Sequence, residues 1–307
     1  MEAQCEETHP ADRCFLTFPY LRLPKNNVIM RKLAFVIAAA FAFTSADAQQ
    51  LRTPAPSPTQ TVKQDFGLSN IELSYSRPGM KGRKIFGDLV PYGKVWRTGA
   101  NNATTVTFGE EVSIGGKKVP AGKYGLVTIP DKNNWTVIIT KQLDVTSPAA
   151  YKQDQDVVRV DVKPSTIDNT VETFTMQFAN IKSNSADLQI MWDRTSVSLP
   201  ISADVETKVM AQIDQLMNKD NRPYFNAAMY YMDNGKDMNQ ALTWLDKAVE
   251  IQPNAFWIHH QRANALAKLG KKEDARKAAT KSRELAVTAK NDDYVSLNDK
   301  LLAELDK

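Results

Sequence analysis

A glycine-rich basic segment, residues 77–103, holds the side chains best suited to binding chemistry. It carries six Lys or Arg residues and a single acid, Asp88. Arginine offers a rigid donor fork for carboxylate or phosphate, and glycine lets backbone amides approach a ligand. We therefore predict a site for an anionic or sugar-like ligand, with these binding residues: Arg77, Lys81, Arg83, Trp96, Arg97 and Asn101.

The same residues also permit a structural interpretation. The cations could pair with carboxylates of the surrounding domain, with Trp96 as a core residue. The segment is longer than most connecting loops and holds apolar residues such as Ile85, Phe86 and Val90. That content is too apolar for a disordered stretch, so we expect it to pack back on the domain.

Catalytic residue types are scarce around this segment. Residues 59–201 contain no histidine and no cysteine, which removes the commonest bases and nucleophiles. We expect a non-enzymatic protein. Carboxylate-dependent hydrolysis of carbohydrate is the alternative, although its candidates lie in apparent turns and strand starts, where solvated acids are common. They are Asp88, Asp131, Asp154 and Asp156.

No metal or other cofactor is expected. Beyond residue 48 the only histidines are His259 and His260, and no cysteine remains. Adjacent residues on a helix point about 100° apart, so this pair cannot act like ligands four residues apart. A surface position or packing between helices is the expected role of both histidines.

Alternating apolar and polar residues predict strands through the first half of the chain. The pattern is plain at 71–75, 157–162, 174–178 and 188–192. Turn residues separate such runs, among them Asp168–Asn169. About nine short strands between Thr59 and Ile201, with no helical stretch among them, predict an antiparallel β-sandwich.

Helical spacing replaces this pattern from Ala203 onward. Two segments repeat at an interval of 34 residues, so that Ala241 aligns with Ala275 and Ala248 with Ser282. A helix–turn–helix unit of this period resembles the tetratricopeptide repeat. Residues 292–306 are expected to form a capping helix. The resemblance implies a protein or peptide partner. The positions that match the repeat are Ala241, Leu245, Ala248, Pro253, Ala263, Leu266, Gly270 and Ala275.

A secretory signal is predicted at Met30–Gln50 rather than at the first residue. Two basic residues precede an apolar run from Leu33 to Phe43, and Ala46-Asp47-Ala48 gives a cleavage site. The run is too short to span a bilayer, so we expect export to the periplasm or beyond, with no transmembrane segment in the mature chain. The net charge of +4 gives no argument for nucleic acid.

These patterns predict five parts. Residues 1–29 precede the true start, 30–48 are the signal peptide, and 49–58 are a proline-rich linker. The β-sandwich then covers 59–201, and the helical domain with two repeats covers 203–307.

The basic segment also resembles a known family. Exported proteins of the Bacteroidota carry a domain of unknown function with a motif like Arg77–Asn101, a hairpin like Gly115–Pro130 and a strand like Thr136–Lys141. The resemblance implies export and a β-rich domain, and it implies no activity. We expect an exported binding or scaffold protein; the alternatives are the hydrolase above and a structural envelope component without a small ligand.

Overall fold

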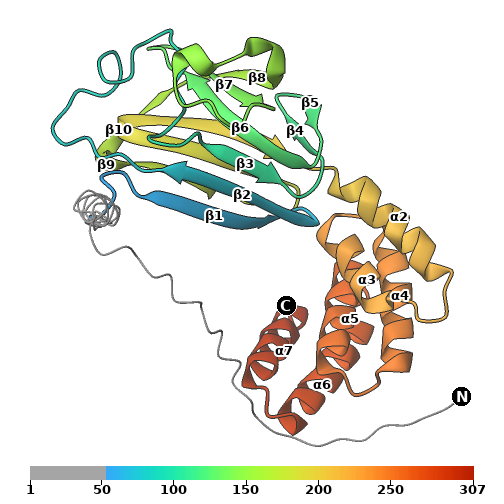
Figure 1. Cartoon of the computed structure of the whole chain (residues 1–307). Coiled ribbons are helices and arrows are strands. Elements are labelled where there is room, and N and C mark those ends of the chain that lie inside the picture. The colour runs from blue at the N-terminus through green and yellow to red at the C-terminus, as the bar shows by residue number, and fades with distance from the viewer. Residues whose placement is uncertain (1–52) are drawn as a thin grey trace, which may run out of the picture. The chain divides into compact units, whose positions relative to one another are not determined.

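The computed structural model describes residues 53–307 (Figure 1). The predicted upstream extension (1–29), the signal peptide (30–48) with its cleavage after Ala48, and the first four residues of the linker (49–52) lie outside the described residues. Within residues 53–307, no helix has both the length and the apolar character needed to cross a membrane.

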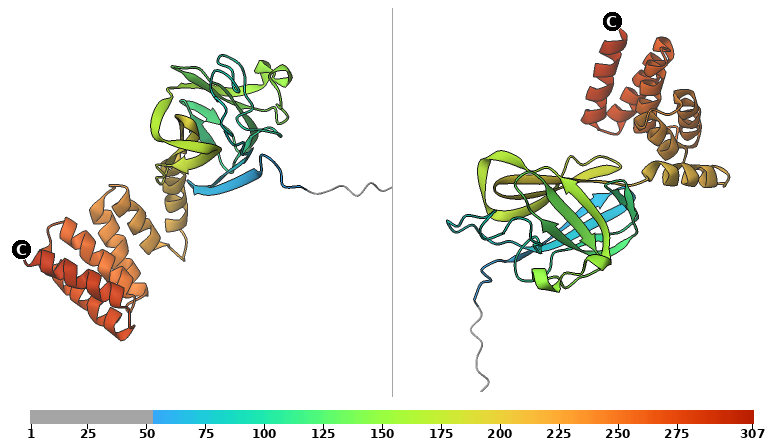
Figure 2. Two further views of the ribbon diagram at one scale, coloured as in Figure 1. Left: turned by 90° about the vertical axis from the view of Figure 1, so that its left-hand side faces the viewer. Right: turned by 90° about the horizontal axis from the view of Figure 1, so that it is seen from above.

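Ten antiparallel strands form two sheets that face each other (Figure 2), which confirms the predicted sandwich. One sheet has the order β1-β2-β3-β6-β7-β8, and the other has the order β5-β4-β10-β9. The strands are β1 (Thr59–Phe66), β2 (Ser69–Ser76), β3 (Thr105–Phe108), β4 (Val112–Ile114), β5 (Lys117–Val119), β6 (Gly122–Ile129), β7 (Trp135–Thr140), β8 (Asp156–Val162), β9 (Ser165–Ala179) and β10 (Ser185–Ser202).

Alternation places one face of each strand in the core between the sheets. In β2, Ile71 and Leu73 are fully buried while Glu72 between them is exposed. In β10, Leu188 and Ile190 are buried in the same cluster. Burying such a side chain contributes about 1.5–3 kcal/mol, so a shift of register by one residue would expose the whole apolar set.

The turn predicted at Asp168–Asn169 is wrong. Both residues lie inside β9, which runs for 15 residues beside β10. The pairing slips on either side of Asp193, a residue with a positive φ of 54° in β10. Such bulges bend a strand without ending it. Asp168 and Asn169, which both favour turns, therefore lie in an exposed stretch of β9.

The basic segment lies between β2 and β3 and connects the two sheets. Near its start, Gly79 forms an isolated bridge with Thr173 of β9. Near its end, Trp96 exchanges backbone hydrogen bonds with Thr128 of β6, at 2.7 and 2.9 Å. This is possible because short β3 pairs only with the first half of β6. The segment therefore packs back on the sandwich, as its apolar residues predict.

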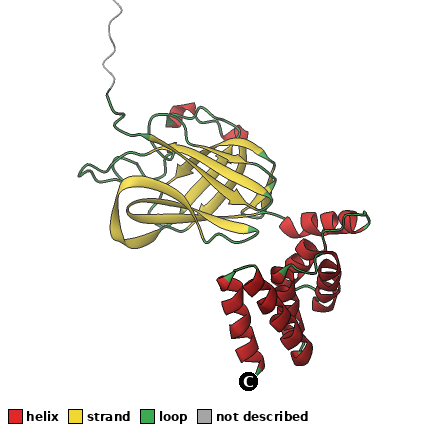
Figure 3. Cartoon of the chain, turned by 90° about the horizontal axis from the view of Figure 1, so that it is seen from below, coloured by secondary structure: helices red, strands yellow, loops and turns green. Residues whose placement is uncertain are grey.

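Helices make up the rest of the described chain (Figure 3). The pairs α3–α4 and α5–α6 are the two repeats, and α7 follows them. Gly235 and Gly270, which end α3 and α5, both have positive φ values that only glycine adopts freely. The helices are α2 (Val205–Met217), α3 (Tyr224–Asp233), α4 (Met238–Ile251), α5 (Phe256–Lys268), α6 (Lys272–Thr288) and α7 (Asp292–Leu305).

Small residues at the repeat positions allow the helices to pack closely. Ala241, Ala263 and Ala275 are fully buried, and Ser282 donates a hydrogen bond to the Phe256 carbonyl. The expected capping helix is α7, which buries Leu301 and Leu305 against the array. Leu297 of the same helix is exposed.

The first turns of α2 belong to the sandwich core. Ala203 and Val205 are buried in the same cluster as the strands, and Val209 packs against it. The Glu110 side chain accepts a hydrogen bond from the Leu68 amide at 2.8 Å and also pairs with the Lys208 ammonium. Helix α2 is thus anchored to the β-domain.

Candidate functional site

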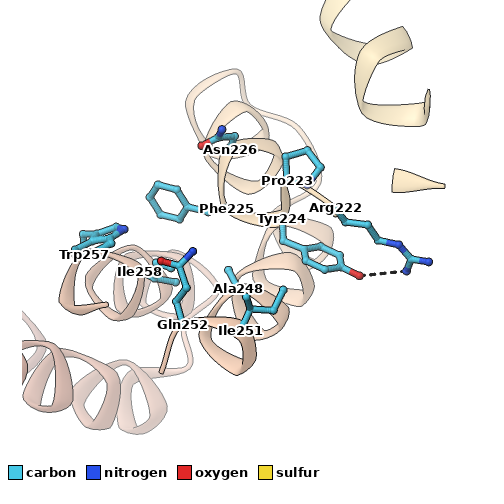
Figure 4. Close-up of a pocket in the computed structure, with 10 residues that line it drawn as sticks. All are labelled: Arg222, Pro223, Tyr224, Phe225, Asn226, Ala248, Ile251, Gln252, Trp257 and Ile258. Carbon is cyan, nitrogen blue, oxygen red and sulfur yellow. Dashed lines mark hydrogen bonds between the residues drawn. The ribbon is translucent and has the colours of Figure 1, made fainter. Parts of the chain in front are cut away.

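The helical array contains a cavity of about 220 Å³ where α3 begins, α4 ends and α5 begins (Figure 4). The three helix ends meet there because the turn after α4 returns the chain to start α5 beside α3. The cavity is lined by Arg222, Pro223, Tyr224, Phe225, Asn226, Ala248, Ile251, Gln252, Trp257 and Ile258.

Apolar side chains form much of the wall. Ile251 and Trp257 remain 62% and 37% exposed, although both are large hydrophobic residues. Ile258, next to Trp257, is buried in the array core. Its burial fixes the first turn of α5 and with it the position of Trp257. Exposed apolar surface gathered in one place marks interaction sites, whereas single exposed apolar residues are common on any protein.

A cation stands at the other end of the cavity from Trp257 (Figure 4). Arg222 donates from Nε to the Lys219 carbonyl and from Nη1 to the Tyr224 hydroxyl, both at 3.1 Å. Within residues 53–307 its Nη2 has no hydrogen-bond partner. The guanidinium is thus held in place with donors left over, an arrangement suited to a carboxylate.

The structure does not bring the six sequence-predicted ligand residues together in one place. Arg77 donates to the Phe174 carbonyl and the Thr175 hydroxyl, and Arg83 donates to the carbonyls of Gly79 and Met80. The Arg77 bonds tie the start of the segment to β9, and the Arg83 bonds close a turn within the segment. Both arginines therefore satisfy backbone groups, and neither has a carboxylate partner among the described residues.

Lys81 and Asn101 are also apart from any shared cavity. The Lys81 side chain is exposed, and its backbone amide donates to Glu172 Oε1 at 2.9 Å. Asn101 donates to the Ser57 carbonyl at 3.0 Å. Both residues have positive φ values, 50° and 55°, so they occupy turns of the segment.

Trp96 is the centre of an aromatic cluster between the sheets. Its ring stacks on Trp192 at 5.9 Å with an interplanar angle of 16°, and it meets Phe174 edge-on at 5.1 Å. The cluster also includes Phe86 and Trp135. Trp96 nevertheless contributes to the wall of a second cavity, where it is followed directly by Arg97.

This second cavity, of about 300 Å³, lies between the end of the basic segment and residues 146–148. Arg97 Nη1 donates to the Thr146 carbonyl, while its Nε is covered and has no partner. Of the predicted ligand residues, the structure brings only Trp96 and Arg97 together here. The remaining lining residues are Leu89, Val90, Pro91, Lys94, Val95, Thr146, Ser147 and Pro148.

Asp131 and Asp156, two of the carboxylates considered for hydrolysis, lie near opposite ends of the β7–β8 pair. Asp131 lines a small cavity of about 100 Å³ with Tyr92 and Trp135, and the residues that line it include no second acid. Asp156 pairs with Arg159 at 2.8 Å and accepts a hydrogen bond from the Tyr151 hydroxyl at 2.5 Å. Glycoside hydrolysis uses two carboxyl groups on either side of the bond, and neither arrangement provides such a pair.

The Tyr151–Asp156–Arg159 group was not identified from the sequence. Burial, followed by the hydrogen bond to Asp156, raises the pKa of Tyr151 to about 12, although Arg159 acts in the opposite direction. Asp156 Oδ1 is buried without a partner. The three residues tie the segment after β7 to β8, so we assign them a structural role.

Of the two roles expected for the histidines, packing between helices is the one found, because both are buried in the array. His259 contacts the Pro253 carbonyl and His260 contacts Asn298 Oδ1, both at 2.8 Å. Asn298 in turn donates to Ser282 and to the Tyr294 carbonyl. Among residues 53–307, no cluster of three His, Cys, Asp or Glu could hold a metal ion.

Comparison with known families agrees with both halves of the fold. Residues 57–201 match the family described as "Protein of unknown function (DUF2911)", and residues 244–277 match the tetratricopeptide repeat. The chain therefore joins a domain of the first family to a C-terminal tetratricopeptide region. Neither the curated proteins nor the solved structures yielded a match.

Proposed function

We propose that this domain of the DUF2911 family and its tetratricopeptide region form a non-enzymatic scaffold, in which the helical array docks a protein partner. The cavity between α3, α4 and α5 carries the proposal. Helical repeats stack to make extended binding surfaces, and here the surface includes two exposed apolar side chains beside a cavity.

The chemistry of the cavity indicates the kind of partner. Phe225, Ile251 and Trp257 offer apolar contact, and Arg222 has free donors at the opposite end. Helices α3 and α5 both begin here with no side chain capping their first amides, which favours negative charge nearby. We propose a protein segment that presents an apolar side chain next to an acidic group.

Exchange of one exposed apolar residue tests this proposal. Ile251→Asp places a charge at the cavity, whereas Val287→Asp places it at an exposed position of α6 outside the cavity. We expect affinity capture from the native host to recover the same partner with the wild-type chain and with Val287→Asp. Ile251→Asp should lose that partner, because the charge would be desolvated on binding. Equal recovery with both variants would rule out this cavity as the docking site.

We also propose that the β-domain binds a small anionic or sugar-like ligand. The cavity of about 300 Å³ beside Arg97 favours this ligand-binding role. Of the predicted ligand residues, we therefore retain Trp96 and Arg97 in the proposed site. Arg77, Arg83 and Asn101 instead hold the backbone of the segment and its neighbours.

Export completes the proposal. It rests on the basic residues, apolar run and small-residue site between Met30 and Gln50. A chain expressed from Met30 should leave the cytoplasm and begin at Gln49, which N-terminal sequencing of the exported product would reveal. A product that retains Met30 would contradict the assignment.

A further inference from the structure

The cavity beside Arg97 lies on the outer side of the six-stranded sheet. Trp96 pairs with Thr128 of β6, and Gly93 donates to the Pro130 carbonyl, so residues 93–96 run alongside β6. Residues in an extended segment point alternately to opposite sides. Trp96 points into the sandwich core, and Val95 accordingly packs in a separate cluster with Val127 and Ile138.

The walls of this cavity are largely apolar. Val90 is buried, and Leu89 remains 43% exposed at the edge. Pro91, Val95 and Pro148 add further apolar surface. The volume of about 300 Å³ corresponds to about ten water molecules at liquid density. An apolar group of modest length could therefore be accommodated.

Two cations line the same cavity, Lys94 and Arg97. Neither forms an ion pair with any acid in residues 53–307. The acids nearest in sequence, Asp88 and Asp144, do not line it. Two cations thus line this cavity, and no acid is among its lining residues.

Arg97 is held in place while most of its donors stay unused. One N–H bonds to the Thr146 carbonyl, and Nε is covered without a partner. A buried donor left unpaired is unfavourable, and a guanidinium can bind a carboxylate through two parallel bonds. A carboxylate at this place would use donors that the protein leaves free.

We infer that this cavity binds a small monocarboxylate with an apolar tail, the carboxylate meeting Arg97 and Lys94 and the tail lying along Leu89, Val95 and Pro148. This inference rests on the proposed ligand-binding role of the β-domain and names the class of ligand. A sugar would match the site less well, because hydroxyl groups against these walls would lose their hydrogen bonds to water.

Calorimetric titration of the full chain tests the inference, with octanoate as the probe. Octanoate should bind, while acetate and octanamide should each bind at least about tenfold more weakly. Acetate lacks the tail and octanamide lacks the charge. The double variant Lys94→Ala/Arg97→Lys should weaken octanoate binding by about tenfold or more, because it removes one charge and the arginine fork.

The matched control is Lys84→Ala, which removes an exposed cation of the same segment outside the cavity and should leave octanoate affinity unchanged. Thermal melting of each variant verifies that it is folded. Octanamide binding as tightly as octanoate, or a double variant that binds octanoate normally, would overturn the inference. Binding of glucuronate without octanoate would overturn it while supporting the broader ligand-binding proposal. No binding of any probe would overturn both.

Discussion

Arg77 shows at the scale of a single residue how a predicted ligand group can serve the fold. Its guanidinium bonds to the Phe174 carbonyl and the Thr175 hydroxyl of β9. Arg77→Ala should lower the free energy of unfolding by about 1.5–3 kcal/mol, the usual range for hydrogen bonds to charged groups. Denaturant titration would measure this loss against Lys84→Ala, whose side chain is exposed. Equal midpoints for the two variants would contradict the structural role of Arg77.

Tyr151 predicts a pH dependence of stability. Its pKa is raised to about 12 by burial and by its bond to Asp156, so the folded state holds the proton more tightly than the unfolded chain, in which tyrosine has a pKa near 10. The stabilisation is present below about pH 10 and is lost as the pH rises toward 12. Tyr151→Phe should therefore melt below the wild type at pH 8, with the difference narrowing between pH 10 and 12. A gap independent of pH would contradict this.

The residue types of the candidate site can be predicted from the sequence, but the directions in which their side chains point cannot. The sequence singled out Trp96 and Arg97, which do share a cavity, yet it could not tell that one side chain would point into the core and the other outward. The direction of each side chain follows from the pairing of Trp96 with Thr128. No alternation of apolar and polar residues within the segment predicts this pairing. The exposed residues Ile251 and Trp257 were not predicted as site residues. Each lies at a helix end among other apolar residues of the repeats, and the sequence does not distinguish the exposed ones from the buried ones.

At the scale of elements, close approach of helices depends on small residues. Ala275 of α6 is fully buried in the array core. Ala275→Leu should destabilise the array by about 1–3 kcal/mol, because extra atoms in a packed core force neighbours apart. Thr280→Leu, at an exposed position of the same helix, is the control and should change little. The helical circular dichroism signal followed during thermal melting would separate the two.

Elements with local signals could be predicted, and those set by distant pairing could not. The alternation in β2 and the recurrence of small residues at Ala241 and Ala275 are patterns of residue type that can be read in the sequence itself. The basic segment has no such pattern, because its order comes from pairing with Thr173 of β9 and Thr128 of β6. The turn predicted at Asp168–Asn169 is wrong for a related reason. The pairing of β9 with β10 outweighs the local preference of these two residues for a turn.

For the whole molecule, we predict that the β-domain folds without the helical array, and the residues that α2 adds to the sandwich core decide where to cut the chain. A fragment Gln49–Ser202 should fold into a β-domain but lacks Ala203 and Val205, which are buried in the sandwich core. It also lacks Lys208, the partner of Glu110. A fragment ending at Asn218 retains all three residues and should be more stable by about 1.5–3 kcal/mol, the value of one buried aliphatic side chain. Equal melting temperatures for the two fragments would show that α2 adds nothing to the domain.

The bridge between Gly79 and Thr173 has a consequence for self-association in solution. Strand β9 is the outermost strand of the four-stranded sheet, and an uncovered outer strand offers its backbone groups to another molecule. Here the Phe174 amide donates to the Pro78 carbonyl and the Met80 amide donates to the Glu172 carbonyl, so this stretch of β9 already has its partners within the same chain. Residues 78–80 thus cover this part of the β9 edge and shorten the stretch open to edge-to-edge pairing, a hazard that would rise with concentration if the segment were cut or loosened.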